Sequence, residues 1–217
     1  MATTTHQSMA EPNETEELFV AFANTIVRTH GKAIETIPDA DALLSWLREH
    51  GLISSRGRAT EAARQRREPQ EADRRLERFR HLRDVLHATA GDLSADGQPH
   101  PERVTEINHI LRHGLHYHQL RPEGDGARYE VTQVGDRLDQ ARAAIASSFA
   151  HFLADDARDR LRVCANEGCL WLFVDRSPTG RRRWCDMRTC GNQAKVARHR
   201  ARARAGLAGV PSPPSAD

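Results

Sequence analysis

Residues 164–190 read CANEGCLWLFVDRSPTGRRRWCDMRTC and contain every cysteine of this 217-residue chain. The spacing is C-x4-C-x15-C-x4-C, which places two close pairs one hairpin's length apart. Two short loops that each supply two thiolates are typical of a structural zinc site, because zinc prefers four soft ligands in a tetrahedron. The sequence therefore predicts one structural Zn²⁺ with four ligands: Cys164, Cys169, Cys185 and Cys190.

Other uses of the four cysteines stay open: two disulfides, an iron–sulfur cluster, or four unrelated buried thiols. The first residues, MATTTHQSMAEPNET at 1–15, lack the apolar stretch of a secretion signal. We therefore expect a soluble cytoplasmic protein, in which ligand cysteines are commoner than disulfides. A site closed by four thiolates leaves no position for a reactive water, so the metal is expected to be structural and not catalytic.

The residues between the two cysteine pairs predict a hairpin. The run LWLFVD at 170–175 resembles a strand, SPTG at 177–180 resembles a turn, and RRRW at 181–184 returns the chain to the second pair. A helix-compatible run begins at Ala194. A knuckle, a hairpin and a helix in this order resemble a treble clef. About 40 residues contain too little core to fold alone, so metal binding is expected to stabilise the unit. Its small apolar centre is expected to consist of Trp171, Phe173 and Trp184.

Charge is distributed unevenly along the chain, although the formal net charge is only +2. Residues 161–217 carry 11 Lys/Arg and 4 Asp/Glu, whereas residues 1–160 carry 21 Lys/Arg and 26 Asp/Glu. Because 30 of the 32 basic residues are arginine, the ratio of bases to acids is a better guide than the number of arginines. From Arg176 to Arg204 there are ten basic residues and one acid, a composition suited to neutralising phosphates.

The basic end is expected to contact double-stranded DNA. Helix positions i, i+3, i+4 and i+7 share a face, and on this helix they are Lys195, Arg198, His199 and Arg202. The other expected contacts to DNA are Arg200, Arg181, Arg182 and Arg183. The alternative is a solvated, arginine-biased helix that contacts nothing, but surface helices usually mix both signs of charge.

The preceding residues predict a mainly helical body with one β-hairpin, and hence an α+β fold. Apolar periodicity and capping signals predict helices at about 39–50, 59–67, 70–90, 101–113 and 137–157. The stretch LHYHQLRPEGDGARYEVT at 115–132 alternates around a loop of Pro, Gly and Asp and predicts the hairpin. The apolar run at 18–27 is too short for helix or strand to be chosen.

Composition and these elements divide the chain into four parts. The last long helix leads into the cysteine region without a flexible linker, so the basic end is expected to pack rigidly on the body. The Arg/Glu-rich stretch at 56–78 is expected to be a solvated, ion-paired face. The parts are a disordered N-terminus at 1–15, a body at 16–160, a zinc module at 161–205 and a disordered tail at 206–217.

Residues 162–204 resemble the CGNR zinc finger family. The stretches that carry the resemblance are FVDRS (173–177), RRWC (182–185), CGNQAK (190–195) and HRAR (199–202). Gln193 stands where that family has the arginine of its name. If that arginine contacts DNA, this chain has lost one charge-assisted contact or changed its preference. If the arginine is structural, Gln193 can replace it by hydrogen bonding.

The body resembles the ABATE domain, through LFVAFANTI (18–26) and LLSWLREHGLI (43–53). The resemblance implies a bacterial, stress-induced transcription regulator without catalytic activity. The zinc module would bind DNA, while the body would sense a small-molecule effector or mediate formation of a homodimer. Asn24 and Thr25 either close a turn or line the cavity for such a ligand.

Two other classes of function compete with a DNA-binding regulator: an RNA-binding or protein-interaction module with a structural zinc, and a body that binds a small molecule or is a cryptic enzyme of unknown activity. No P-loop, GxGxxG, nucleophile elbow or HExxH motif occurs, so no enzyme is expected. No membrane partner is expected either, since the apolar run at 18–23 is far too short to cross one. The expected location is the cytoplasm, in association with the nucleoid.

A cluster of histidines is interpreted as surface or packing residues, because it lacks a third metal ligand at suitable spacing. Its members are His109, His113, His116 and His118.

Overall fold

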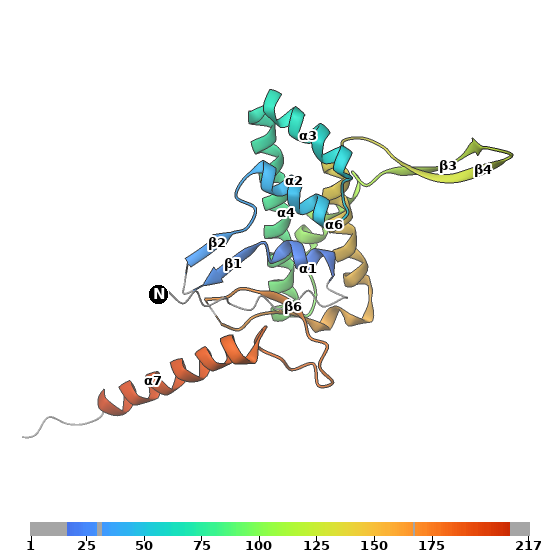
Figure 1. The fold of residues 1–217 in the computed structure, drawn as a ribbon. Coiled ribbons are helices and arrows are strands. Elements are labelled where there is room, and N and C mark those ends of the chain that lie inside the picture. Colours follow the sequence, from blue (N-terminus) through green and yellow to red (C-terminus); the bar gives the residue numbers. More distant parts are fainter. Residues whose placement is uncertain (1–16, 30–31, 167, 209–217) are drawn as a thin grey trace, which may run out of the picture.

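The computed structural model describes residues 17–29, 32–166 and 168–208 (Figure 1). Within these residues a mainly helical body is combined with small two-stranded sheets, which confirms the predicted α+β class. The long helix α4 (Pro69–Asp96) runs through the body, and α1 (Leu18–Ala23) and α6 (Arg137–Ala154) pack against it. The other body helices are α2 (Ala40–Glu49), α3 (Ser55–Arg67) and α5 (Pro101–Leu111).

Each sheet in the described residues is a pair of antiparallel strands. The body contains the ribbon of β1 (Ile26–Thr29) and β2 (Lys32–Glu35), and the long hairpin of β3 (His116–Glu123) and β4 (Gly126–Gln133). The third sheet pairs β5 with β6 in the C-terminal module. Its bounds are Leu161–Val163 for β5 and Leu172–Val174 for β6. A 3₁₀ turn, Asp156–Arg160, connects α6 to β5, and helix α7 (Asn192–Ala208) ends the described chain.

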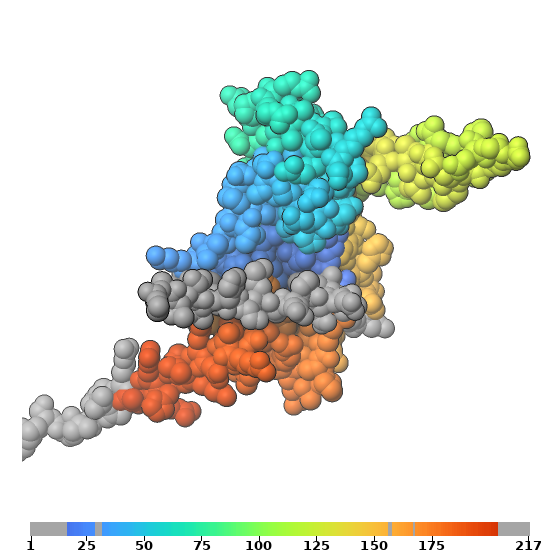
Figure 2. Space-filling model, in the orientation of Figure 1, coloured from blue at the N-terminus to red at the C-terminus, as the bar shows by residue number. Residues whose placement is uncertain are grey.

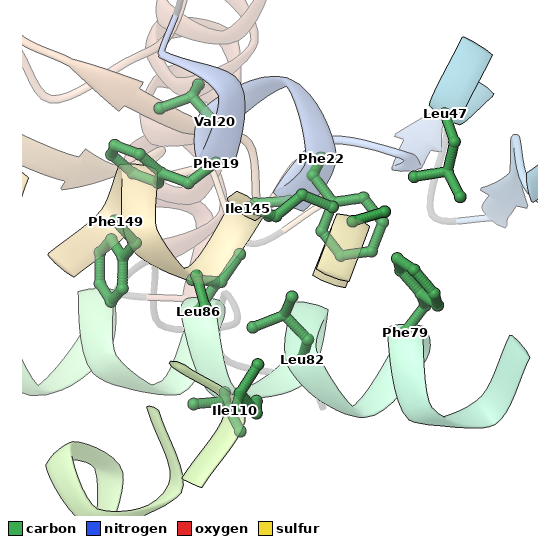
Figure 3. Packing of buried hydrophobic residues seen from close by; sticks show 14 of the residues in the cluster. Phe19, Val20, Phe22, Leu47, Phe79, Leu82, Leu86, Ile110, Ile145 and Phe149 are labelled. Atoms are coloured by element: carbon green, nitrogen blue, oxygen red, sulfur yellow. The ribbon is translucent and has the colours of Figure 1, made fainter. Parts of the chain in front are cut away.

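The core lies where α1, α4 and α6 meet (Figure 3). Phe19 of α1 packs its ring 4.9 Å from that of Phe149 on α6, measured between centroids, and is fully buried. Leu82 and Leu86 supply the face of α4 below them, and both have no exposed surface. Each such buried side chain contributes about 1.5–3 kcal/mol to folding, so this aromatic and aliphatic contact holds the body together.

The sequence predicted most elements, and its errors have local causes. Helix α2, helix α5 and the β3–β4 hairpin occur where they were expected. Helix α3 begins four residues earlier than 59, because Ser54 caps it by accepting a hydrogen bond from Gly57 N–H at 3.0 Å. The expected end of α4 near Gly91 is wrong. The helix continues to Gly97, whose φ of 72° is the left-handed conformation that ends helices.

The undecided run at 18–27 contains both structures. Residues 18–23 form α1, and β1 starts at Ile26 after a turn. Thr25 Oγ1 closes this turn by donating to Phe22 O at 2.8 Å. Helix and strand therefore lie on either side of Asn24 and Thr25 in one short, mainly apolar stretch, which periodicity alone could not divide.

The stretch at 56–78 is only partly solvated, which corrects the expectation of a solvated face. Glu61 is 4% exposed and receives hydrogen bonds from Arg75 at 3.3 Å and Arg137 at 3.1 Å. Asp136 accepts from Arg64 at 2.8 Å and from Arg75 at 2.9 Å. Burial alone would raise the pKa of Asp136, but the Arg64 hydrogen bond and its other partners lower it below the ordinary value. These paired charges join α3, α4 and the start of α6.

The C-terminal module packs on the body through β5 and β6, which supports the expected rigid packing. Leu161 and Leu172 are 1% and 0% exposed and belong to the body's core. Asn24 pairs with the backbone of Leu172: its Nδ2 donates to Leu172 O at 2.9 Å, and its Oδ1 accepts from Leu172 N at 2.9 Å. The side-chain amide thus makes the two hydrogen bonds to β6 that the backbone of a neighbouring strand would otherwise make.

Some expectations fall beyond the described residues. The disordered N-terminus predicted at 1–15 lies outside them, as does most of the tail predicted at 206–217. Helix α7 extends to Ala208, three residues into that tail. The four-part division of the chain stays a prediction. Among the described helices, none combines the length and the apolar character that a membrane crossing requires.

We expect Asn24→Ala to lower the free energy of unfolding by about 2–4 kcal/mol, because the buried N–H and C=O of Leu172 would each lose a partner. Urea unfolding of the full, zinc-loaded chain measures this loss. Asn108→Ala is the matched control, because Asn108 is exposed on α5. Equal stability of the two variants would show that the amide does not hold the module.

Candidate metal centre and nucleic-acid interface

The four cysteines lie close together in space, although 15 residues separate the first pair from the second in the sequence. Their Sγ atoms all lie within 4.8 Å of one another, and two of the separations, Cys169–Cys185 and Cys185–Cys190, are 3.7 Å. A tetrahedral zinc with bonds of about 2.3 Å requires sulfurs about 3.8 Å apart. The cluster therefore fits one Zn²⁺ ion. The four cysteines are free thiols, and 3.7 Å is far longer than a disulfide bond of about 2.0 Å.

The first pair lies in the turn of the β5–β6 hairpin. Cys164 follows β5 directly and donates its N–H to Trp171 O at 2.9 Å. Cys169 donates its N–H to Asn166 O at 2.8 Å, which closes the knuckle between the two cysteines. Leu170 has a φ of 58°, an uncommon value for a residue with a side chain. This turn directs the backbone from the knuckle into β6.

In the second pair, Cys185 precedes a π-helical turn, Met187–Gly191, and Cys190 lies within this turn, just before α7. Asp186 caps this turn, because its Oδ1 accepts from Arg188 N at 2.6 Å and from Thr189 N at 3.0 Å. Gly191 is buried, and a Cβ atom there would lie 2.4 Å from Met187 Sδ. A side chain at this glycine of the Cys-Gly-Asn motif would therefore displace the exposed Met187 side chain.

The thiols favour a cation electrostatically. The Cys185 thiol donates toward Cys169 and lowers the pKa of Cys169 to about 5. The same contact raises the pKa of Cys185 above its ordinary value, and burial raises that of Cys190. One thiolate thus forms readily, whereas further negative charge in the same small volume is opposed. A divalent cation removes this repulsion, which is the condition for four thiolate ligands.

The hairpin of the module differs from the expected one. We expected the strand at 170–175 to pair with RRRW at 181–184, but β6 pairs with β5 and carries the knuckle at its turn. Residues 181–184 form no strand. They are held by one side-chain and one backbone hydrogen bond instead: Arg182 N donates to Asp175 Oδ2 at 2.8 Å, and Arg183 O accepts from Ala165 N at 2.7 Å.

Asp175 organises the loop between β6 and the second cysteine pair. It is 1% exposed, and its Oδ1 also accepts from Ser177 N at 3.0 Å. Burial alone would raise the pKa of Asp175, but interactions with Ser177 and with the backbone N–H of Arg182 hold it at about 2. The buried carboxylate therefore stays charged and fixes the path of the arginine triplet. Sequence reasoning did not assign it a role, although the FVDRS stretch contains it.

The predicted DNA contacts differ in their surroundings. Lys195, Arg198, His199, Arg200 and Arg202 are exposed on α7, which extends away from the body (Figures 1 and 2). In the triplet that precedes the second cysteine pair, two guanidinium groups also have contacts within the module.

Arg182 lies over the Phe173 ring at 5.1 Å and donates to Cys185 O at 2.6 Å, and Arg183 lies over Trp184 at 5.3 Å. Phe173 belongs to the module's small cluster with Trp171 and Trp184, as expected. Arg182 therefore stabilises the fold of the loop, whatever its role toward a partner.

Gln193 links α7 to the knuckle. Its Oε1 accepts a hydrogen bond from Asn166 Nδ2 at 2.8 Å, between the first cysteine pair and the helix that follows the second. The side chain is exposed, so it also remains accessible to a partner. This contact fits the structural alternative that the sequence left open for this position.

Two family models match the chain. The model of ABATE, described as "Putative stress-induced transcription regulator", matches residues 16–156, and the CGNR zinc finger model matches residues 160–203. The chain belongs to the ABATE family. Its ABATE body is followed by a CGNR zinc finger, in the order that the sequence predicted, and these families are regulators and zinc fingers, not enzymes. No curated protein matches the chain.

The remaining candidate residues from the sequence lie in the ABATE body. Asn24 and Thr25 are 6% and 3% exposed, and their polar atoms bond within the chain, which is the structural alternative. Their role toward a ligand stays a prediction. In the predicted histidine cluster, the ring centroids of His109 and His113 lie 5.6 Å apart and those of His116 and His118 lie 5.3 Å apart.

We expect Cys164→Ser to remove most of the bound zinc, because a hydroxyl is a poor substitute for a buried thiolate ligand. Elemental analysis should find one zinc per wild-type chain and a small fraction of that in the variant. A chelator should lower the melting temperature of the wild type but change that of the variant little. Full zinc content in Cys164→Ser would exclude this thiol as a ligand.

Proposed function

We propose that the chain is a DNA-binding transcription regulator. Its CGNR zinc finger holds one structural Zn²⁺ through Cys164, Cys169, Cys185 and Cys190, and α7 contacts duplex DNA. The observation that carries the proposal is the charge and the exposure of α7. The helix has no acidic residue and five basic ones, and its side chains from Lys195 to Arg202 are exposed. Such a function would place the protein in the cytoplasm at the nucleoid.

The pattern of ion pairs supports DNA binding by α7 over the alternative, in which the arginines of α7 only reflect the arginine-rich composition of the chain. In the body, arginines bond to acids, as Arg83 does to Glu35 at 2.6 Å and Arg58 to Asp41 at 3.2 Å. Within the described part of the chain, no ion pair joins an acid to Lys195 or to the arginines at 198, 200 and 202. Their positive charge is therefore available to phosphates, whose neutralisation dominates DNA affinity.

A notch of about 340 Å³ lies between the knuckle and α7, beside the basic face. Arg183 and Arg198 stand at its edge, together with Asn166 and Trp184. Two cations and an amide around a concave surface suit a phosphate and its sugar, with the arginines providing charge-assisted hydrogen bonds. We therefore include this notch in the proposed interface, along with Arg181, Arg182 and Arg200.

The direct test is binding of the zinc-loaded chain to labelled duplex DNA at several salt concentrations. We expect the triple variant Lys195→Ala, Arg198→Ala and Arg202→Ala to bind at least about tenfold more weakly and to reduce the log–log salt slope by about 2.7, or 0.9 for each lost phosphate contact. Fluorescence anisotropy measures both quantities.

The control for this test removes the same charge elsewhere. Arg56, Arg66 and Arg67 are exposed on α3, and their triple alanine variant should keep the wild-type salt slope. Absence of wild-type binding at low salt would reject the DNA proposal. Stronger binding to a structured RNA competitor than to the duplex would favour the RNA-binding alternative.

A substitution at Gln193 provides a second test of DNA binding, because it should add a contact to a phosphate. Gln193→Arg adds a cation at an exposed position of the first turn of α7, so we expect tighter DNA binding and a salt slope about 0.9 steeper. Gln193→Ala should leave the slope unchanged, since it removes only the hydrogen bond from Asn166. An unchanged slope in Gln193→Arg would mean that this position does not face the phosphates.

The ABATE body is proposed to regulate the zinc finger by sensing a small-molecule effector or by association. Its contact with β6 provides a physical connection between the two parts, through Asn24 and Leu172. A thermal-shift screen of metabolites on the full chain addresses the effector, because a ligand of the folded state raises the melting temperature.

A further inference from the structure

The β3–β4 hairpin, residues 116–133, projects from the body as an arm (Figures 1 and 2). Residues opposite each other on its two strands lie on the same side of the ribbon. On one side Leu120 lies opposite Tyr129, and His118 lies opposite Val131. Leu120 is 69% exposed, Tyr129 63% and Val131 50%. This side of the arm is therefore an exposed apolar strip.

The other side of the arm is polar, yet it is the less exposed of the two. Gln119 Nε2 donates to Thr132 Oγ1 at 2.7 Å, Arg121 pairs with Glu130, and both Gln119 and Glu130 are half-buried. A hairpin with one covered face normally buries its apolar side and exposes its polar side. Two-stranded hairpins that cover no apolar face are marginally stable. The arm therefore offers an exposed apolar strip that a partner could cover.

The charge of the arm favours a protein over a nucleic acid as its partner. Residues 116–133 carry two basic residues and three acidic ones, so the net charge of the arm is negative. A phosphate backbone would be repelled, in contrast to the basic helix α7. The partner must instead offer an apolar surface and a free strand edge, and the arm itself has both.

The outer edge of β4 is the one suited to pairing. Pro122 lacks an N–H and interrupts the outer edge of β3, whereas β4 contains no proline. The hairpin closes with a two-residue loop, and in such a hairpin alternate residues of each strand direct their backbone groups away from the other strand. In β4 these residues are Ala127, Tyr129 and Val131, which also carry the apolar side.

We propose that two copies of the chain pair along β4, antiparallel, about a two-fold axis at Tyr129. This register places Arg128 opposite Glu130 of the partner subunit, and the symmetry repeats that pair. It also places Ala127 opposite Val131 of the partner subunit. The charges are complementary on the polar side, and the two apolar strips join into one face of a four-stranded sheet.

A hollow at the base of the arm fits the same arrangement. It has a volume of about 290 Å³ and lies between the arm, α5 and α6, lined by Leu111, Val131, Gln133, Ala143 and Ala144 among others. In the proposed register the loop of the partner's arm ends beside Gln133, at the mouth of this hollow. The partner's arm would thus fill a depression that the monomer leaves open.

Sedimentation equilibrium of the full, zinc-loaded chain tests the dimer. We expect the wild type to reach twice the chain mass of 24.3 kDa. Arg128→Glu alone, and Glu130→Arg alone, place like charges opposite each other on both sides of the axis. Each should raise the dissociation constant at least about tenfold. An equal mixture of the two variants should dimerise again, because the acidic pair of one chain then faces the basic pair of the other.

The mixture also serves as the folding control, since a misfolded arm would not be rescued by mixing. Arg48→Glu, an exposed reversal on α2, should leave the dimer unchanged. A wild type that stays monomeric overturns the proposal, as does a dimer that ignores both reversals or a mixture that fails to associate. If the wild type is monomeric and Arg128→Glu weakens DNA binding, the arm contacts DNA instead.

Discussion

The pairing of Asn24 with the backbone of Leu172 is the contact on which the placement of the C-terminal module depends. Without a partner the N–H and C=O of this buried residue would be left unsatisfied, at a cost of about 1–3 kcal/mol each. The Leu172 side chain meanwhile belongs to the body's core. One residue of β6 therefore binds the body by both its backbone and its side chain, and the four-thiol cluster begins in the turn of the same short hairpin, directly before this residue. The orientation of α7 relative to the body follows from this junction and from the metal.

The junction also connects to the polar interior of the body. Thr25, next to Asn24, accepts a hydrogen bond from Arg83 at 3.0 Å, and Arg83 pairs with Glu35 of β2. A buried arginine with two partners is stabilising only while both remain in place. A displacement of β1 and β2 would therefore disturb Thr25 and, beside it, the amide that holds β6. This chain of contacts is a physical route by which the body can act on the module.

The sequence predicted the chemistry of the module better than its topology. Cysteine spacing identified four thiols that do converge, because a metal site restricts ligand identity and spacing strongly. The predicted strand pairing was wrong, because the side-chain pattern of a three-residue strand such as β6 is too short to indicate its partner strand. The path of residues 181–184 is determined by hydrogen bonds to Asp175 and to the knuckle. In the body, Gly91 looked like a helix end. The helix passes it because Leu93 still packs on the core and Gly97 offers the left-handed cap.

Helix α7 and the arm both bury little of their own surface, and they differ in what could cover them. Helix α7 is basic and lacks a core-facing apolar stripe, so only an anionic, hydrated surface suits it. The arm is net negative and offers apolar side chains beside a free strand edge, so it suits a protein strand. The two elements therefore do not compete for one partner. A two-fold dimer through the arm would contain two copies of α7, and when both contact the same DNA molecule the second contact forms at a high effective concentration. Dimerisation would raise affinity in this way without any additional contact between a single module and DNA.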